Sequence, residues 1–281
     1  MRGLIAAAGY GTRFLPVTKS IPKEMLPLID TPTLEFIIDE FAAAGIKEVA
    51  VITSRRKKSM EDYFDHDIEL ESLFRREQAE AKLKMIQPKD ISMVWIRQKE
   101  MLGTGHALLQ AKSFIGDQPF ICAYPDDIHF GSPCLSAQLI ETYNQTGCCV
   151  LGSIHNPPGL ERYGVLALAE DGLHVTDIVE KPPKGTEPSK EVSIGRYLYT
   201  PEIFKYLEEG WNLHTGPGEY FHIYALKKLM DQQKVVHRRI TGERLDIGAP
   251  EGYLRAIIRY ASARPELLPV LQEELKRITD G

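Results

Sequence analysis

The sequence predicts an α/β protein, because strand and helix patterns alternate along its first part. An apolar run that ends at Ala8 is typical of a buried strand, and a glycine loop follows it. Leu34 to Phe41 carries apolar residues at helical spacing, and Gly45 ends that helix. Glu48 to Thr53 reads as a second buried strand. A strand–helix–strand unit of this kind implies a parallel pair with a right-handed crossover.

The pattern changes after about residue 155. Tyr163 to Leu168 and Leu173 to Val179 read as two strands, and Glu170-Asp171-Gly172 between them predicts a hairpin. Val192 to Tyr199 follows as a strand with Gly195 inside it, and a strand glycine often marks a close approach of backbone or ligand. The second part of the chain is therefore predicted to be antiparallel.

The remaining elements follow from periodicity and turn residues. The charged segment Lys57 to Lys84 predicts one or two solvated helices. Further strands are expected at Ile91–Ile96, Phe120–Tyr124, Cys148–Ile154 and from Val235. Further helices are expected at Leu135–Tyr143, Glu202–Leu207, Tyr220–Met230, Glu251–Ala261 and Pro265–Ile278, with a loop at Trp211–Gly218. The stripe Leu267, Leu268, Leu271 and Leu275 is interpreted as core packing.

Composition excludes several classes of function. The chain has 281 residues, of which 43% are apolar, and its net charge is −5. An acidic balance does not indicate a nucleic-acid or anionic-membrane surface. The first apolar run is too short for a secretory leader, and no segment approaches the roughly 20 apolar residues of a membrane span. The four cysteines lack C-x-x-C spacing, so we expect buried thiols in a reducing cytoplasm.

The loop after the first strand predicts a phosphate site. Gly9 and Gly11 allow a close approach to the main chain, whose N–H groups can form an anion-binding nest. Arg13 and Lys23 would add two full positive charges. The loop is not a P-loop, since no Gly-Lys-Ser/Thr follows, and Phe14 replaces the third glycine of the dinucleotide fingerprint. On these residues alone, a plain turn remains an alternative.

Two later strand ends carry candidate ligand contacts. Gln98 follows the third strand, and its amide can both donate to and accept from a pyrimidine edge. Gly103, five residues on, would let the backbone approach the base, although an ordinary loop before a helix also fits. Asp126 follows the fourth strand, where a carboxylate could hold hydrated Mg²⁺ or merely cap the loop. Asp127 should point the other way and not share that ion.

The first 30 residues resemble the signature of the sugar-nucleotide pyrophosphorylases. Gly-Thr-Arg-Phe-Leu-Pro from Gly11 and Pro-Lys-Glu-Met-Leu-Pro from Pro22 are most similar to bacterial members that use UTP and glucose 1-phosphate. The resemblance implies transfer of the uridylyl group of UTP to glucose 1-phosphate, which gives UDP-glucose and pyrophosphate. It implies a Rossmann-like nucleotide-diphospho-sugar transferase fold, with an open, mostly parallel sheet and a mixed, antiparallel sugar-binding insertion.

The resemblance also implies a division of the chain and of its site. A nucleotidyltransferase domain would span residues 1–263, with a nucleotide-binding half at 1–155, a sugar-phosphate-binding half at 156–250, and a packing or oligomer-contact helix at 264–281. Catalysis would rest on Arg13 and Lys23, and Mg²⁺ on Asp126 and Asp246. Nucleotide contacts are assigned to Ala8, Gly9, Gly11, Thr12, Glu24, Gln98 and Gly103. Sugar-phosphate contacts are assigned to Gly164, Glu180, Lys181 and Gly195.

One segment departs from the family pattern. Where related enzymes usually have Gly-Glu-Ile-Gln-Leu-Thr-Asp, this chain has Gly-Glu-Tyr-Phe-His-Ile-Tyr from Gly218 to Tyr224, so we expect differences on the sugar side or in subunit contact. A related enzyme for another base or sugar, such as dTTP, and a catalytically silent regulatory subunit are the alternatives. A double-displacement enzyme needs paired histidines, and none of the eight histidines lies within three residues of another. UTP and glucose 1-phosphate are the expected partners, in a cytoplasmic homo-oligomer, a dimer or tetramer.

Overall fold

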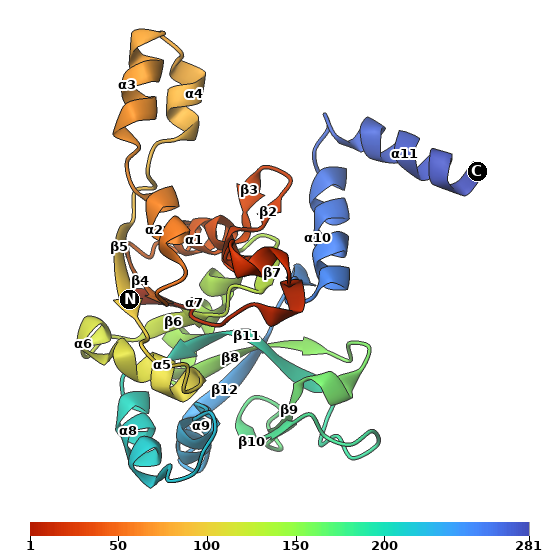
Figure 1. Cartoon of the computed structure of the whole chain (residues 1–281). Helices are drawn as coiled ribbons and strands as arrows, with labels where there is room; N and C mark the ends of the chain where they lie inside the picture. The colour runs from red at the N-terminus through yellow and green to blue at the C-terminus, as the bar shows by residue number, and fades with distance from the viewer. Residues whose placement is uncertain (281) are drawn as a thin grey trace.

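The computed structural model describes residues 1–280, and a nine-stranded mixed sheet forms its centre (Figure 1). Four of the strands make a parallel unit in the order β5-β4-β1-β6. Their bounds are Arg2–Ala6 (β1), Glu48–Thr53 (β4), Ser92–Arg97 (β5) and Phe120–Ala123 (β6). The predicted parallel strand–helix–strand unit is confirmed, and the carboxyl ends of β1, β5 and β6 meet at one edge of the sheet.

The antiparallel part continues from β6 through β11. β11 is antiparallel to β6, β8 and β9, and the predicted hairpin is formed by β9 and β10. The strands are Cys149–His155 (β8), Gly164–Leu168 (β9), Val175–Glu180 (β10), Glu191–Tyr199 (β11) and Val235–Arg239 (β12). β12 lies parallel to β8. One sheet therefore joins both parts of the chain, as the predicted fold class requires.

Helices cover both faces of this sheet and bury its apolar side chains. One core includes Phe41, Met60 and Leu139, from α1 (Thr33–Ala43), α2 (Lys58–Phe64) and α7 (Leu135–Thr146). The other includes Leu108, Leu207 and Leu226, from α5 (Thr104–Gln110), α8 (Ile203–Leu213) and α9 (Ile223–Met230). A short helix, α6 (Lys112–Ile115), follows α5. The resulting arrangement is helix, sheet, helix.

A small two-stranded ribbon lies beside the main sheet, at the edge where the carboxyl ends of the parallel strands meet. β7 (Asp127–Phe130) pairs with β13 (Glu243–Asp246), so that Asp127 lies opposite Asp246. A second ribbon pairs β2 (Pro27–Leu28) with β3 (Thr31–Pro32). Ile128 and Leu245 of the first ribbon pack with Leu28 and with Ala256 of α10 (Pro250–Ser262).

Several expected elements differ from the structure. The charged segment forms three short helices, α2, α3 (Ile68–Arg76) and α4 (Glu80–Met85), because turns at residues 65–67 and 77–79 interrupt it. α8 continues to Leu213, and α9 begins only at Ile223, because the Tyr220 backbone makes its hydrogen bonds with Leu102 and Gly105 beside α5 and not within a helix.

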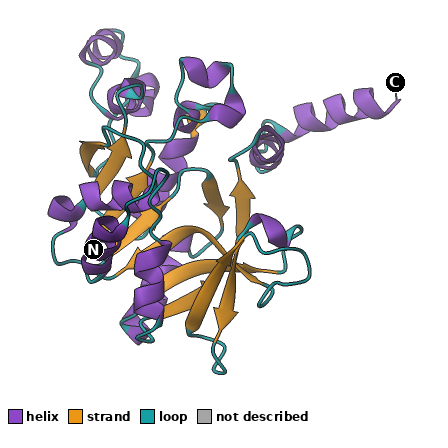
Figure 2. Ribbon diagram, turned by 60° about the horizontal axis from the view of Figure 1, so that its bottom comes forward, coloured by secondary structure: helices purple, strands orange, loops and turns teal. Residues whose placement is uncertain are grey.

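The C-terminal helix also differs from its prediction. α11 (Leu268–Asp280) leaves the body of the molecule and buries none of its residues (Figures 1 and 2). Its leucine stripe is therefore not core packing, since Leu275 is 48% exposed. Within residues 1–280, no helix is both long enough and apolar enough to cross a bilayer.

Candidate active site

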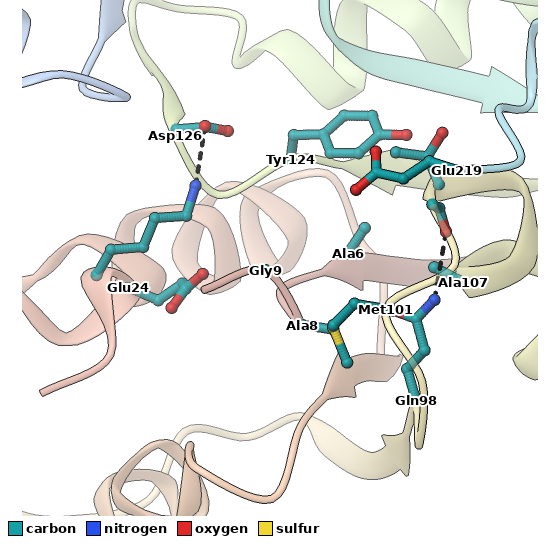
Figure 3. Close-up of a pocket in the computed structure, with 13 residues that line it drawn as sticks. Ala6, Ala8, Gly9, Glu24, Gln98, Met101, Ala107, Tyr124, Asp126 and Glu219 are labelled. Carbon is teal, nitrogen blue, oxygen red and sulfur yellow. Dashed lines mark hydrogen bonds and ion pairs between the residues drawn. The ribbon is translucent and has the colours of Figure 1, made fainter. Parts of the chain in front are cut away.

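Two neighbouring cavities lie at the carboxyl edge of the sheet. Ala8, Gly9, Gln98 and Gly103 line the first cavity, at the ends of β1 and β5 (Figure 3). Gly164, Glu180 and Gly195 line the second cavity, over β9, β10 and β11. Tyr124 and Asp126 line both, so the loop after β6 is the wall between them. Ligand sites outside the carboxyl ends of strands are the rule in open α/β sheets.

The glycine loop after β1 borders both cavities. Gly11 has a φ of 68°, and its carbonyl accepts a hydrogen bond of 2.8 Å from the Thr18 hydroxyl. Gly9 is exposed, with open space where a side chain would project, so its main chain is accessible to a ligand. Gly11 itself packs on Lys23 and Thr18, and the exposed Thr12 lines neither cavity.

Lys23 and Asp126 form an ion pair beside the shared wall. Lys23 Nζ lies 2.9 Å from Asp126 Oδ2, and the two side chains keep 21% and 32% of their surface exposed (Figure 3). Burial alone would lower the pKa of Lys23, but the charges of Asp126 and Glu24 outweigh it and raise that pKa. Burial would raise the pKa of Asp126, but Lys23 holds it below its ordinary value. Both groups are therefore charged near neutral pH.

Glu24 was assigned to nucleotide contact from the sequence, but the structure places its carboxylate in a buried ion pair. It lines the first cavity but is only 1% exposed, and its carboxylate accepts hydrogen bonds of 2.8 and 2.7 Å from Lys57 Nζ. Lys57 also donates to the carbonyl of Ala7 at the end of β1. Burial lowers the pKa of Lys57, and Glu24 opposes that shift. This pair fixes the turn that carries Lys23 against the first strand, and sequence reasoning missed Lys57.

Gln98 and Gly103 lie together at the far end of the first cavity. Gln98 is buried, and its Nε2 donates to the Gly103 carbonyl at 3.3 Å (Figure 3). The same nitrogen also lies 3.0 Å from His106 Nδ1. Gly103 has a φ of 94°, and an added Cβ would lie 2.5 Å from the carbonyl oxygen of Tyr220. A side chain is therefore excluded at this position, and the amide of Gln98 is held beside exposed backbone.

Side chains rather than backbone form the second cavity. Glu180 Oε1 occupies the space that a side chain at Gly164 would fill, and burial raises the pKa of Glu180 while Lys181 lowers it. Gly195 donates its N–H to Asp127 Oδ2 at 2.6 Å, and Asp127 also pairs with Arg244.

Of the cations near this cavity, Lys181 was assigned from the sequence, whereas Arg162 and Arg244 were not. Lys181 is exposed at the edge of the second cavity with a φ of 47°, and it is not among the lining residues. Arg162 and Arg244 do line the cavity, together with Arg13. Neither Arg162 nor Arg244 stands in a motif that the resemblance covers, so sequence reasoning missed both cations.

Asp126 and Asp246 face one small volume beside Gly248. A methyl group on Gly248 would lie 3.2 Å from Asp126 Oδ2, 3.2 Å from Asp246 Oδ1 and 3.3 Å from Arg13 Nη1. Asp246 Oδ1 also accepts the Gly248 N–H at 3.0 Å. In residues 1–280, no three His, Cys, Asp or Glu side chains gather as a metal-binding group. Two carboxylates completed by phosphate oxygens still suit Mg²⁺, so these residues fit that ion.

The segment that departs from the family pattern lies mainly against the first cavity. The Tyr220 N–H donates to the Leu102 carbonyl at 2.8 Å, and the Tyr220 carbonyl accepts the Gly105 N–H at 2.9 Å. Glu219 lines the first cavity beside Gly103 (Figure 3). This segment therefore reaches the second cavity, on the sugar side, through the shared wall, which its residue His222 contacts at Tyr124.

Fold and site together define an α/β protein with two neighbouring cavities, which share Tyr124 and Asp126, at the carboxyl edge of its sheet. The family model described as "Nucleotidyl transferase" matches residues 2–263, and the chain belongs to this family. It is 38% identical to the UTP–glucose-1-phosphate uridylyltransferase of Staphylococcus epidermidis, covering 99% of this chain and 98% of that protein. The enzyme of that name from Bacillus subtilis is also 38% identical, covering 98% of this chain and 97% of that protein.

Comparison with solved structures supports the same family and fold. A UTP-bound UGPase from Acinetobacter baumannii superposes with a TM-score of 0.88 at 31% identity and covers 98% of each chain. A UDP-glucose pyrophosphorylase complexed with UDP-glucose superposes with a TM-score of 0.80 at 35% identity, covering 94% of this chain and 99% of that one. The predicted family and fold class are confirmed.

Proposed function

We propose that this chain transfers the uridylyl group of UTP to glucose 1-phosphate, forming UDP-glucose and releasing pyrophosphate. The observation that carries the proposal is the meeting of the two cavities at Asp126, with Lys23 paired to it. A nucleotide in the first cavity and a sugar phosphate in the second would bring their phosphates together at this wall. The names of the relatives support the same reaction.

The negative charges of the two substrates determine what the protein must supply for this reaction. An oxygen of the sugar phosphate attacks the α-phosphorus of UTP, a new P–O bond forms, and the bond to the β-phosphate breaks as pyrophosphate leaves. The nucleophile is already an anion, so the protein has to align the reactants and offset repulsion between phosphates. Lys23, which pairs with Asp126, and Arg13, which lies beside Gly248, would stabilise the negative charge of the transition state. Lys181 would hold the attacking phosphate from the edge of the second cavity.

Mg²⁺ is part of the proposal. Asp126 and Asp246 would hold it, and the ion, when bound, would supply further charge neutralisation at the triphosphate. Arg244 Nη2, 3.3 Å from Asp246 Oδ2, orients the second carboxylate. The silent-subunit alternative is not favoured, because both cations and both carboxylates are present at one place. Oligomeric state and cytoplasmic location stay predictions from the sequence.

The first experiment measures pyrophosphate release with glucose 1-phosphate and, separately, UTP, dTTP, ATP, GTP or CTP, with Mg²⁺ or with EDTA. We expect release with UTP and none in EDTA. A strong preference for another nucleotide would keep the reaction type but overturn the assignment of Gln98 and Gly103 to uracil. No release with any nucleotide would contradict the proposal, and persistence in EDTA would contradict the metal role.

A further inference from the structure

A buried histidine from the departing segment touches the wall between the two cavities without lining either one. His222 is 7% exposed, and burial lowers its pKa to about 4, so the ring is neutral at neutral pH. The catalytic scheme above gives it no role. Its position between the two binding sites, however, places it where a small displacement would be felt by a ligand.

The contacts of His222 define its hydrogen-bonding state. The main-chain N–H of His222 points to the Thr104 hydroxyl at 3.4 Å, so that oxygen acts as acceptor there. The same hydroxyl lies 2.9 Å from His222 Nδ1, to which it can donate its proton. The Tyr124 hydroxyl lies 3.4 Å from Nδ1 as well. Nδ1 therefore lies within hydrogen-bonding distance of two hydroxyls, whereas Nε2 is buried and has no partner within residues 1–280.

Tyr124 is the residue through which His222 reaches the ligands. Its ring lines both cavities and meets the Tyr197 ring edge-on, with centroids 5.9 Å apart. Its main chain is fixed, because its N–H donates to the Gly195 carbonyl at 2.9 Å. Tyr197 also meets the His222 ring edge-on at 5.5 Å. The ring of Tyr124 is thus held at its hydroxyl end by His222, which Thr104 in turn contacts, and along its edge by Tyr197.

We propose that His222 is a positioning residue that fixes the Tyr124 ring as a wall of the second cavity and thereby sets the affinity for the sugar phosphate. This inference rests on the proposed function, which assigns the second cavity to that substrate. Removing Nδ1 takes away the side-chain nitrogen that the Tyr124 hydroxyl meets and so frees that end of the ring. The ring can then turn toward the sugar side, where only side-chain packing with Tyr197 opposes it.

Thr104 and Tyr124 also line the first cavity, but its base end, at Gln98 and Gly103, should respond less, because the main chain holds that end. The loop around Gly103 is held by two backbone hydrogen bonds with Tyr220, and neither involves the His222 ring. Thr104 begins α5, so helical hydrogen bonds fix its backbone as well. Loss of the His222 ring atoms therefore leaves the base end in place while it loosens the shared wall.

The test compares His222→Leu with His222→Asn by steady-state kinetics in the UTP and glucose 1-phosphate assay. Asn can place its amide oxygen near the position of Nδ1, and Leu cannot. We expect His222→Leu to raise KM for glucose 1-phosphate by roughly three- to tenfold, as loss of one or two neutral hydrogen bonds implies. KM for UTP should change by less than about twofold, and His222→Asn should stay close to wild type.

Further measurements separate positioning from general structural damage. Tyr124→Phe removes only the hydroxyl and should raise KM for the sugar to a similar extent, with no further increase in the double variant. Calorimetric binding should show weakened UDP-glucose and unchanged UTP in His222→Leu. Equal losses for both substrates, failure of Asn to rescue, or additive effects of the two variants would overturn the inference. Lack of turnover in the wild type would instead count against the proposed function.

Discussion

The two cavities are built from different parts of the polypeptide. At the end of the first cavity that holds Gln98, the main chain is prominent: Gly103 packs against the Tyr220 backbone, which holds the loop through its own N–H and carbonyl, and Gly9 leaves its main chain open. The second is shaped by charged side chains, including Glu180, Arg162 and Arg244. A nucleoside base is neutral and flat, so fixed backbone and one amide suffice to bind it. A sugar phosphate offers hydroxyls and charge, which side chains of both signs can match.

Two ion pairs formed by the adjacent residues Lys23 and Glu24 also differ from each other, in how far their side chains are exposed. Lys23 pairs with Asp126 at the open wall, where both side chains keep a fifth or more of their surface. Glu24 pairs with Lys57 underneath, where the side chains are 0% and 5% exposed. The first pair can exchange its partner for a phosphate or a metal ion, whereas the second cannot. We therefore expect the buried pair to affect folding and the open pair to affect turnover.

The largest expected effect is on stability, from Lys57→Met. It leaves Glu24 charged, buried and unpaired, and breaking a buried pair in this way costs about 3–5 kcal/mol of unfolding free energy. Urea denaturation followed by circular dichroism measures it. The double variant Lys57→Met/Glu24→Gln should recover much of the loss, because no buried charge remains. If the single and double variants are equally destabilised, the pair is not what fixes the turn under Lys23.

The next effect is on catalysis, from Lys23→Ala or Asp126→Ala. Removing one preorganised charge from a phosphoryl-transfer site lowers kcat by roughly 10²–10³-fold. The thermal midpoint should move little, because this pair is partly exposed. Lys47→Ala is the matched control, since Lys47 makes an exposed ion pair with Asp90 at 3.2 Å before the amino ends of β4 and β5, at the sheet edge opposite the cavities. Turnover within about threefold of wild type in either site variant would refute the assigned roles.

Sequence reasoning succeeded where a function depends on residues close together in the chain. The loop glycines, Lys23 and the five-residue spacing from Gln98 to Gly103 are local features, and the structure places all of them at the carboxyl edge of the sheet. The fold class was predictable for the same reason, because hydrophobic periodicity is local. The roles of these residues in binding remain predictions that the variants above can test.

What sequence reasoning missed depends on distant partners. Lys57 meets Glu24 across 33 positions, and Arg244 meets Asp127 across 117. No local pattern marks such pairs, since a lysine in a charged stretch usually remains on the surface. The predicted helix start at Tyr220 was wrong for a similar reason: hydrogen bonds with Leu102 and Gly105 hold the Tyr220 backbone outside the helix despite its helical pattern. Tertiary contacts outweigh local preference there.

The smallest effect is a pH dependence confined to the second cavity. Burial raises the pKa of Glu180 above its ordinary value, so lowering the pH from 7.5 toward 5 begins to protonate the free protein at this carboxylate. Bound sugar hydroxyls favour the ionised form, because it is the better acceptor, so affinity must fall as the pH falls. The affinity for UDP-glucose, whose phosphates do not titrate in this range, should fall by about threefold when it is measured by calorimetry.

The control is Glu180→Gln, which should bind UDP-glucose more weakly at pH 7.5 and show a flatter dependence of affinity on pH. A slope that persists in Glu180→Gln would contradict the assignment of this titration to Glu180.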